Sequence, residues 1–268
     1  QRKSTIGLAG GFGEVRLGRD YTPLFTIAGI ADPFGTNGVG SSYNLANSLT
    51  VAPEGSIAAD AAETKAGAGF YTTNGTAAGT DPVSVGKAAT SAAISDPNAV
   101  RANNSIAYYS PSFSGFTAGL MYSLGAENTG TTNRSAGKMT SFKLQYANGP
   151  LVGAFGAQST KGSVDTAKWA TTFLAGSYDL GIAKLSAGYK TDKQSFGAAE
   201  GGTFKSTILG VTAPMGAGTI KASYDTKKVD GNANAGATQL GLGYLYALSK
   251  RTTVYGHFAK TSNKADAL

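Results

Sequence analysis

The stretch LGLGYLYAL at residues 240–248 decides the fold class of this chain. Leu or Tyr occupies every even-numbered position of the stretch. A side-chain period of two is that of a β-strand, in which successive side chains point to opposite faces of the sheet. The stretch therefore predicts a strand with one continuous apolar face edged by tyrosines.

The same period recurs in both directions along the chain, for example at 116–124, 142–146, 183–189 and 220–224. In each case one face carries Phe, Leu, Ala or Tyr, and the other is dominated by Gly, Ser, Thr and Lys. A soluble β-sandwich also alternates, but its core face is richer in Val, Ile and Leu, and its outer face carries both signs of charge. The pattern favours a wall with lipid on one side and water on the other.

Twelve segments read as antiparallel strands on this criterion. They are 4–9, 14–19, 104–110, 116–125, 138–147, 151–160, 168–179, 182–191, 203–213, 219–228, 237–247 and 252–261.

Composition supports strands and loops rather than helices. The chain has 268 residues, 38 of them Gly, with 15% charged residues and a formal net charge of +7. A typical soluble domain has about 25% charged residues. No apolar run approaches the roughly 20 residues of a transmembrane helix, but a barrel strand needs only about 9–11 residues of alternating polarity.

Connections between the expected strands alternate in length. The short ones are 10–13, 111–115, 148–150, 180–181, 214–218 and 248–251, and the long ones are 20–103, 126–137, 161–167, 192–202 and 229–236. Outer-membrane barrels have short periplasmic turns and longer external loops. The expected fold is therefore all-β: a single antiparallel transmembrane β-barrel.

The two ends of the chain lead to an expectation about completeness. The first expected strand runs into a short turn and the last one leaves a short turn, so the first points to the periplasm and the last points outward. A barrel with both termini in the periplasm begins with an outward strand and ends with an inward one. We therefore expect an odd number of further strands at each end.

Several motifs resemble the Gram-negative general porins of the β-proteobacterial type, as found in Neisseria and Burkholderia. They are RKSTIGL at 2–8, GFGEVRLGRD at 11–20, RANNSI at 101–106, YYSPSFSGF at 108–116, LSKRT at 248–252 and YG at 255–256. The motifs occur in the family's order along the whole chain, and they are most similar to the anion-selective members.

The resemblance implies a sixteen-stranded outer-membrane barrel, with twelve strands present here, three missing before residue 1 and one missing after residue 268. It also implies a passive channel for small hydrophilic solutes that prefers anions, assembled as a homotrimer in contact with outer-membrane lipid and lipopolysaccharide. Nucleic acid is not an expected partner. In the family the loop after the fifth strand folds inward and narrows the pore. The matching loop here is 20–103, with an expected insertion at 58–93.

Candidate pore residues begin with two arginines. Arginine suits an anion constriction because its guanidinium stays charged and is weakly hydrated. By the resemblance, Arg2 and Arg101 match positions at which anion-selective porins place constriction arginines. By strand parity, however, Arg2 shares a face with Ile6 and Leu8. Either a bulge intervenes, or Lys3 takes the lumen position.

The strand at 14–19 supplies two further candidates. Arg16 alternates with Val15 and Leu17 and should face the lumen. Arg19 is out of phase with Arg16, so it needs a bulge near Gly18 to face inward. For both arginines the alternative is a charge at the membrane interface.

Lysines and one acid complete the set. Lys143 falls on the polar face, as do Lys184, Lys190 and Lys221, and together they could create a positive field in the lumen. The alternative is a solvated face without a role in selectivity. Asp32, in the Asp-Pro-Phe-Gly sequence of the long loop, could oppose the arginines across the constriction, or it could cap a turn.

Nothing in the sequence indicates an enzyme. His257 is the only histidine and cysteine is absent, so no thiolate metal site can form, and no cofactor or metal is expected. The glycines at 10–13 join two strands without a helix to bind phosphate. Two alternatives to a general anion-preferring porin stay open. One is a substrate-specific anion channel on the same scaffold, and the other is a soluble or adhesive all-β protein that binds polyanions.

Overall fold

The computed structural model describes residues 2–46, 96, 98–125, 135, 137–162, 167–196 and 199–264. Its strands form one antiparallel sheet of twelve, in which each strand pairs with its neighbours in sequence. The strands are β1 Ser4–Gly10, β2 Gly13–Tyr21, β3 Arg101–Tyr109, β4 Phe116–Leu124, β5 Lys138–Asn148, β6 Leu151–Lys161, β7 Ala167–Asp179, β8 Lys184–Phe196, β9 Ala199–Met215, β10 Gly218–Val229, β11 Asn232–Ser249 and β12 Thr252–Asn263.

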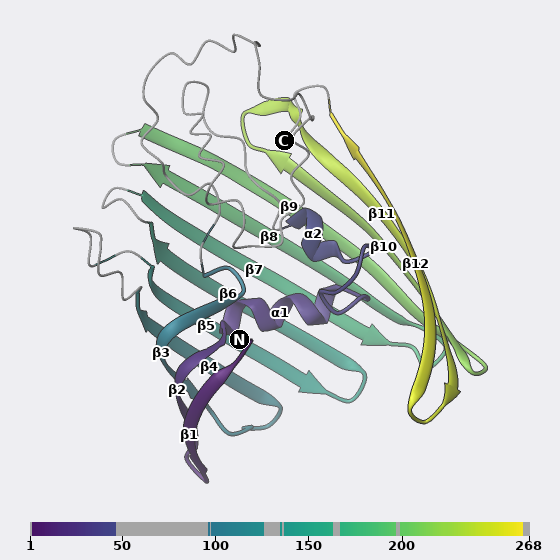
Figure 1. Ribbon diagram of the computed structural model, residues 1–268, viewed down its shortest axis with the longest axis horizontal. Helices are drawn as coiled ribbons and strands as arrows, with labels where there is room; N and C mark the ends of the chain where they lie inside the picture. The colour runs from purple at the N-terminus through teal and green to yellow at the C-terminus, as the bar shows by residue number, and fades with distance from the viewer. Residues whose placement is uncertain are drawn as a thin grey trace.

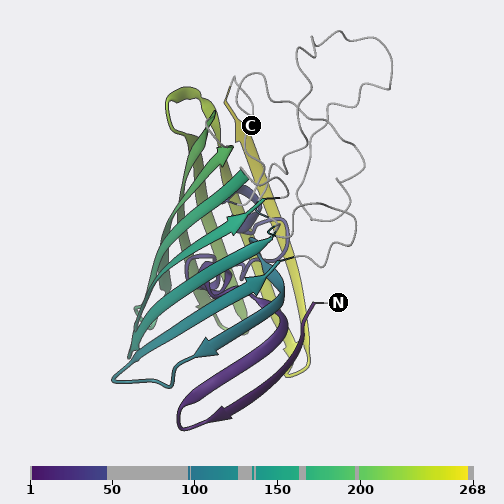
Figure 2. The same cartoon turned by 90° about the vertical axis from the view of Figure 1, so that its left-hand side faces the viewer.

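All twelve predicted strands are present, which confirms the antiparallel all-β fold. Figures 1 and 2 show a tilted, strongly curved sheet that forms most of a barrel wall. Among the described residues β1 pairs only with β2, and β12 pairs only with β11, so the two edges do not meet. The longest strands, β9 and β11, extend beyond their predicted ends into the connections expected to be long.

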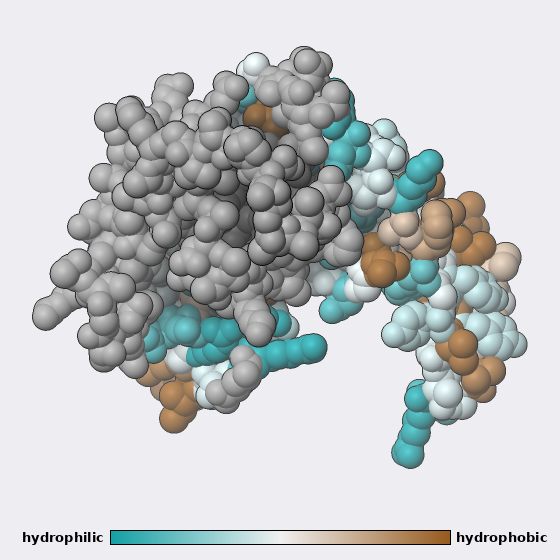
Figure 3. Space-filling view, turned by 45° about the horizontal axis from the view of Figure 1, so that its top comes forward, coloured by the Kyte–Doolittle hydropathy of each residue, from teal (hydrophilic) through white to brown (hydrophobic). Residues whose placement is uncertain are grey.

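The predicted alternation of side chains is confirmed by their exposure. In β4, Leu120 is 50% exposed and Tyr122 is 44% exposed, whereas Met121 between them is 0% exposed. Apolar side chains on the same face are exposed in every strand from β1 to β12, and Figure 3 shows some of them in brown on the visible edge of the sheet. Exposed apolar surface this extensive is unusual for a soluble monomer.

Two short helices lie inside the curve of the sheet, α1 (Pro23–Ala31) and α2 (Ser42–Ala46). In Figures 1 and 2 both lie within the concave side, with α1 crossing the middle strands. The side chain of Thr22 accepts a hydrogen bond from the backbone N–H of Phe25 and caps α1, and Pro23 occupies its first turn. The period-two pattern gave no indication of these helices. None of the described helices is long and apolar enough to cross a membrane.

The main apolar core lies between α1 and the inner wall. The α1 side chains Leu24, Ile27, Ala28 and Ala31 pack against Ala154, Phe173, Ala175 and Ile208 of strands β6, β7 and β9. Burying a large apolar side chain contributes about 1.5–3 kcal/mol. The helix is therefore fixed to the wall by its apolar face. A second, smaller apolar cluster is formed by Ala102, Ala107, Met121 and Met139 of β3, β4 and β5.

Candidate functional site

Glycines on the inner wall create the track in which the inward segment lies. A Cβ atom at Gly156 would lie 2.5 Å from Cδ1 of Ile27, and one at Gly210 would lie 2.6 Å from Cδ of Pro33. At Gly241 it would lie 2.7 Å from the carbonyl oxygen of Gly40. Side chains at these positions would push the segment away from the wall. These glycines therefore allow the inward segment to pack closely against the inner wall.

Hydroxyl and amide groups of the wall hold the backbone of the same segment. The hydroxyl of Ser141 accepts from the N–H of Leu24 at 3.1 Å. The remaining contacts are donated by the wall to carbonyl oxygens: Ser186 to Ala31 at 2.7 Å, Ser223 to Gly40 at 3.2 Å and Gln239 to Ser41 at 2.9 Å. Four strands, β5, β8, β10 and β11, therefore take part in positioning residues 24–41.

Two buried lysines hold the end of α2. The Nζ atoms of Lys190 and Lys227 lie 3.3 and 3.4 Å from the carbonyl oxygen of Ala46. Cations are favourable near the C-terminal carbonyls of a helix. Lys190 also forms an ion pair with Asp192 at 2.9 Å. These lysines anchor the segment, and their charge is directed at protein groups rather than at solvent.

A second anchor lies where the long loop returns to the wall. The carboxylate of Asp96 accepts hydrogen bonds from Gln158 at 2.9 Å and Thr160 at 3.1 Å, both on β6, and from the N–H of Asn98 at 2.8 Å. Burial raises the pKa of the Asp96 carboxyl above its ordinary value, and these hydrogen bonds act in the opposite direction.

Asp32 ends α1 and organises the turn that follows. It is 4% exposed, and its carboxylate accepts from the backbone N–H groups of Phe34 and Thr36 at 2.8 and 3.0 Å. It also accepts from the hydroxyl of Ser41 at 2.7 Å. These contacts match the turn-capping alternative. A role for Asp32 on the pore wall stays a prediction.

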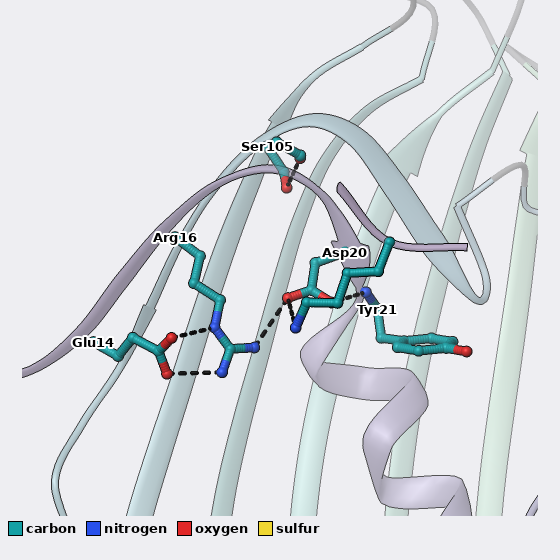
Figure 4. Close-up of polar contacts among 7 residues, drawn as sticks. Glu14, Arg16, Asp20, Tyr21 and Ser105 are labelled. Atoms are coloured by element: carbon teal, nitrogen blue, oxygen red, sulfur yellow. Dashed lines mark hydrogen bonds and ion pairs between the residues drawn. The ribbon is translucent and has the colours of Figure 1, made fainter. Parts of the chain in front are cut away.

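Charged residues of β1 and β2 form a compact network on the inner face, shown in Figure 4. The guanidinium of Arg16 binds both oxygens of Glu14 at 2.6 and 2.7 Å and one oxygen of Asp20 at 3.0 Å. Lys3 reaches the same oxygen of Asp20 at 3.1 Å. Two cations and two anions are thus mutually paired. We call these four residues the β1–β2 charge network.

Arg101 has a different environment at the start of β3. Its Nη2 donates to the hydroxyl of Tyr21 at 2.9 Å, and the centre of its guanidinium lies 4.5 Å from the centroid of the Tyr21 ring. Tyr21 in turn stacks on Phe25 of α1, with ring centroids 5.1 Å apart. No carboxylate among the described residues lies within ion-pair distance of Arg101. Its positive charge is held by aromatic rings and is not cancelled by a paired acid.

The structure shows which of Arg2 and Lys3 faces the inside of the sheet at the first strand. Lys3 is the residue whose ammonium reaches the inner network through the buried Asp20. Arg2 is exposed and lies on the opposite parity. Lys3 therefore occupies the inner position, one of the two possibilities left by the sequence.

Arg19 lies beside the irregularity near Gly18 that the sequence analysis required for it to face inward, but its pairing with β1 stays in register. The pairing of β2 with β3 shifts register between Gly18 and Asp20, and Gly18 has a φ of 120°, which favours glycine. Arg19 pairs with Ser4 of β1 and donates to the side chain of Asn103. Ser4 has the same parity as Ile6, which is 74% exposed on the outer face. A pore-lining role for Arg19 stays a prediction.

Lys143 lies on the inner face of β5, half-buried, with its Nζ 3.4 Å from the side-chain oxygen of Gln145. Like Arg101, it has no paired acid among the described residues. Trp169 of β7 also faces inward and is 3% exposed.

Sequence reasoning missed Glu14, Asp20 and Tyr21, although each of the three gave a signal. Glu14 lies two residues before Arg16 on one strand, so it shares the face of Arg16. Tyr21 follows the strand and lies just before an apolar helix. Asp20 lies four residues after Arg16 and has the same parity, so it shares the face of Arg16 and Glu14.

Taken together, these features define a class of protein: a transmembrane β-barrel with an inward segment fixed to its lumen wall. The chain belongs to the Gram-negative porin family, whose sequence profile matches residues 1–266, and it is an outer-membrane protein.

Individual relatives agree with this assignment. The chain is 34% identical over 273 residues to outer membrane porin protein 32 of Delftia acidovorans, covering 98% of this chain and 64% of that protein. It is 28% identical over 209 residues to an outer membrane porin of Bordetella pertussis, covering 63% of this chain and 54% of that protein. Among solved structures, the anion-selective porin from Comamonas acidovorans superposes with a TM-score of 0.75 at 31% identity, covering 98% of this chain and 68% of that one. The chain thus spans less than two thirds of the length of either sequence relative.

Proposed function

We propose that the full-length protein is a passive diffusion channel for small hydrophilic solutes, that it prefers anions over cations, and that it has no enzymatic activity. A similar solved structure is described as an anion-selective porin. The inner wall of the present chain supplies fixed positive charge, and the formal net charge is +7. We further propose that it works as a homotrimer embedded among outer-membrane lipid and lipopolysaccharide.

The observation that carries the anion preference is the environment of Arg101. Its guanidinium lies beside the inward segment, held by Tyr21, without a paired acid among the described residues. A unit charge at about 4 Å is worth about 1 kcal/mol in bulk water and several-fold more at a lower effective dielectric. Each 1.4 kcal/mol changes a population about tenfold. One such arginine, supported by Lys143, is enough for a clear preference.

The remaining candidates have supporting roles in this proposal. The β1–β2 charge network contributes little net charge because its members cancel in pairs. Arg2 and Arg19 would add to the field near the barrel wall, and Asp32 would shape the constriction by fixing the turn after α1. The long loop 20–103 would narrow the lumen. Its expected insertion at 58–93 lies outside the described residues.

The test is the reversal potential of the full-length protein in a planar bilayer across a KCl gradient. We expect a reversal potential whose sign is that of a channel passing chloride more readily than potassium. We also expect the selectivity to weaken with salt, because the Debye length falls from about 10 Å at 0.1 M to about 3 Å at 1 M. A reversal potential of zero, or of the sign for potassium, at low salt would contradict the proposal.

The alternatives differ in measurable ways. A substrate-specific anion channel would show conductance that saturates with one solute, whereas a general porin would not. A soluble polyanion-binding protein would stay in solution without detergent, which the exposed apolar side chains of all twelve strands disfavour. Trimer formation can be checked by the mass of the detergent-solubilised protein.

A further inference from the structure

The pairing of β8, β9 and β10 brings two lysines and a threonine into one row on the inner face. Lys184 of β8 and Lys221 of β10 are both paired with Thr212 of the strand between them. Neighbouring strands are about 4.8 Å apart, so the two lysine backbones flank Thr212 at about 5 Å on either side. The sequence alone does not show this row, because its members are spread over 38 positions from 184 to 221.

Each member of the row faces inward, because its neighbour two residues along the strand touches the inward segment. Ser186 donates to Ala31, Ser223 donates to Gly40, and a Cβ at Gly210 would collide with Pro33. Residues two apart in a strand share a face. Lys184, Thr212 and Lys221 therefore lie directly beside residues 31–40, on the side of the segment that is nearer to the short turns after β7 and β9.

Both ammonium groups are available to a ligand. Lys184 is exposed and Lys221 is half-buried. Neither forms an ion pair within the described part of the chain, and the hydroxyl of Thr212 has no hydrogen-bond partner there. The acid that faces the row is Asp179, opposite Lys184 in β7, and its carboxylate accepts from the N–H of Gly181 in the turn. The row thus keeps an excess of positive charge.

The neighbouring strands close one end of the row. Gly243 of β11 is paired with Lys221, and His257 of β12 is paired with Gly243. The ring of Phe34 covers both, since it lies 5.0 Å from the His257 ring and a Cβ at Gly243 would lie 2.7 Å from it. The space over Thr212 is therefore bordered by Phe34 on one side and by Pro33, which lies above Gly210, on another. Figure 1 shows the segment after α1 passing over these strands.

We propose that Lys184, Thr212 and Lys221 form a binding site for a compact, doubly charged oxyanion such as inorganic phosphate, on the short-turn side of the inward segment. Two ammonium groups and a hydroxyl provide converging hydrogen-bond donors for such an anion, and lysine binds phosphate as a point charge. This site deepens the proposed function, on which it rests, because its two cations lie beyond the segment on the short-turn side and would receive an anion leaving the constriction.

The test measures block of KCl current by phosphate in the full-length protein in a planar bilayer at pH 7.5. Phosphate added on the short-turn side should block at a lower concentration than phosphate added on the other side. Lys184→Gln and Lys221→Gln should each raise the half-blocking concentration about fivefold, and the double variant more than tenfold. Thr212→Val should raise it less, because it removes one neutral donor.

The matched control is Lys228→Gln on β10. Lys228 is exposed and has the parity opposite to that of Lys221, so its loss removes the same charge from the outer face. Its half-blocking concentration should equal that of the unaltered protein. Equal values in the double variant and the control, or a block that is stronger from the other side, would overturn the site. Reversal potentials in phosphate-free KCl separate the two proposals: loss of chloride preference in the unaltered protein contradicts the channel proposal, whereas a block insensitive to both lysines contradicts only this site.

Discussion

Arg16 and Arg101 are both arginines close to the start of the inward segment, yet their surroundings are opposite. Arg16 binds two carboxylates and lies in a network whose charges cancel, as Figure 4 shows. Arg101 is held by a phenol hydroxyl and a ring face without a paired acid among the described residues. The comparison teaches that a basic residue in a lumen does not by itself make the lumen attract anions.

The physical reason is that electrostatic potentials add. A chloride ion approaching Arg16 also meets Glu14 and Asp20, so the attraction is largely cancelled within a few ångströms. A tyrosine offers a hydrogen bond and a quadrupole to Arg101 but no net charge. Tyr21 can therefore hold a guanidinium in place and leave its field intact.

The largest expected effect is that of Arg101→Gln. Removal of an uncancelled charge beside the inward segment should lower the chloride-to-potassium permeability ratio about fivefold, as expected for a change of about 1 kcal/mol. The measurement is the reversal potential across a KCl gradient at 0.1 M. An unchanged ratio would mean that the other inner lysines, and not Arg101, carry the selectivity.

A smaller effect, of opposite sign, is expected for Glu14→Gln. This change leaves Arg16 partly uncancelled, so the permeability ratio should rise about twofold, less than for Arg101 because the network is more exposed to water. The double variant Glu14→Gln with Arg16→Gln restores neutrality and should return the ratio to that of the unaltered protein. If the double variant instead loses anion preference, Arg16 acts as a free cation and the comparison fails.

The smallest effect is expected for Tyr21→Phe. The ring stays to hold the Arg101 guanidinium and to stack on Phe25, and only the hydrogen bond at 2.9 Å is lost. The permeability ratio should change by less than twofold, whereas Tyr21→Leu, which removes the ring as well, should approach the effect of Arg101→Gln. Equal ratios for Tyr21→Leu and the unaltered protein would show that the aromatic contact does not position the arginine.

The fold could be read from the sequence because it depends on local alternation. Strands such as 240–248 show their two faces directly, and each predicted strand has its counterpart in the sheet. The helix at 23–31 could not be read in the same way. Its apolar residues Leu24, Ile27 and Ala31 can lie against the wall because Gly156 of β6 and Gly188 of β8 leave room for them.

The candidate site was predicted in kind but not in arrangement. Parity alone placed Arg16 and Lys143 on the inner face and offered Lys3 as the inner member of its pair. In the structure Lys3 and Arg16 both contact Asp20, and Lys143 lies near Gln145. Their role in the pore stays a prediction. Parity could place Asp20 on the face of Arg16, four residues earlier, but it could not show that the two side chains meet at 3.0 Å.

By itself, then, the sequence determined that this chain forms an antiparallel sheet with an apolar outer face and a basic inner face, because strand geometry projects every second residue to the same side. Only the tertiary structure decided which inner charges are paired and which are open. Pairing depends on distances between residues such as Arg101 and Tyr21, or Lys184 and Lys221, that lie far apart in sequence or on non-adjacent strands. Charge and parity are local properties of a strand, whereas cancellation of charge is a property of the assembled wall.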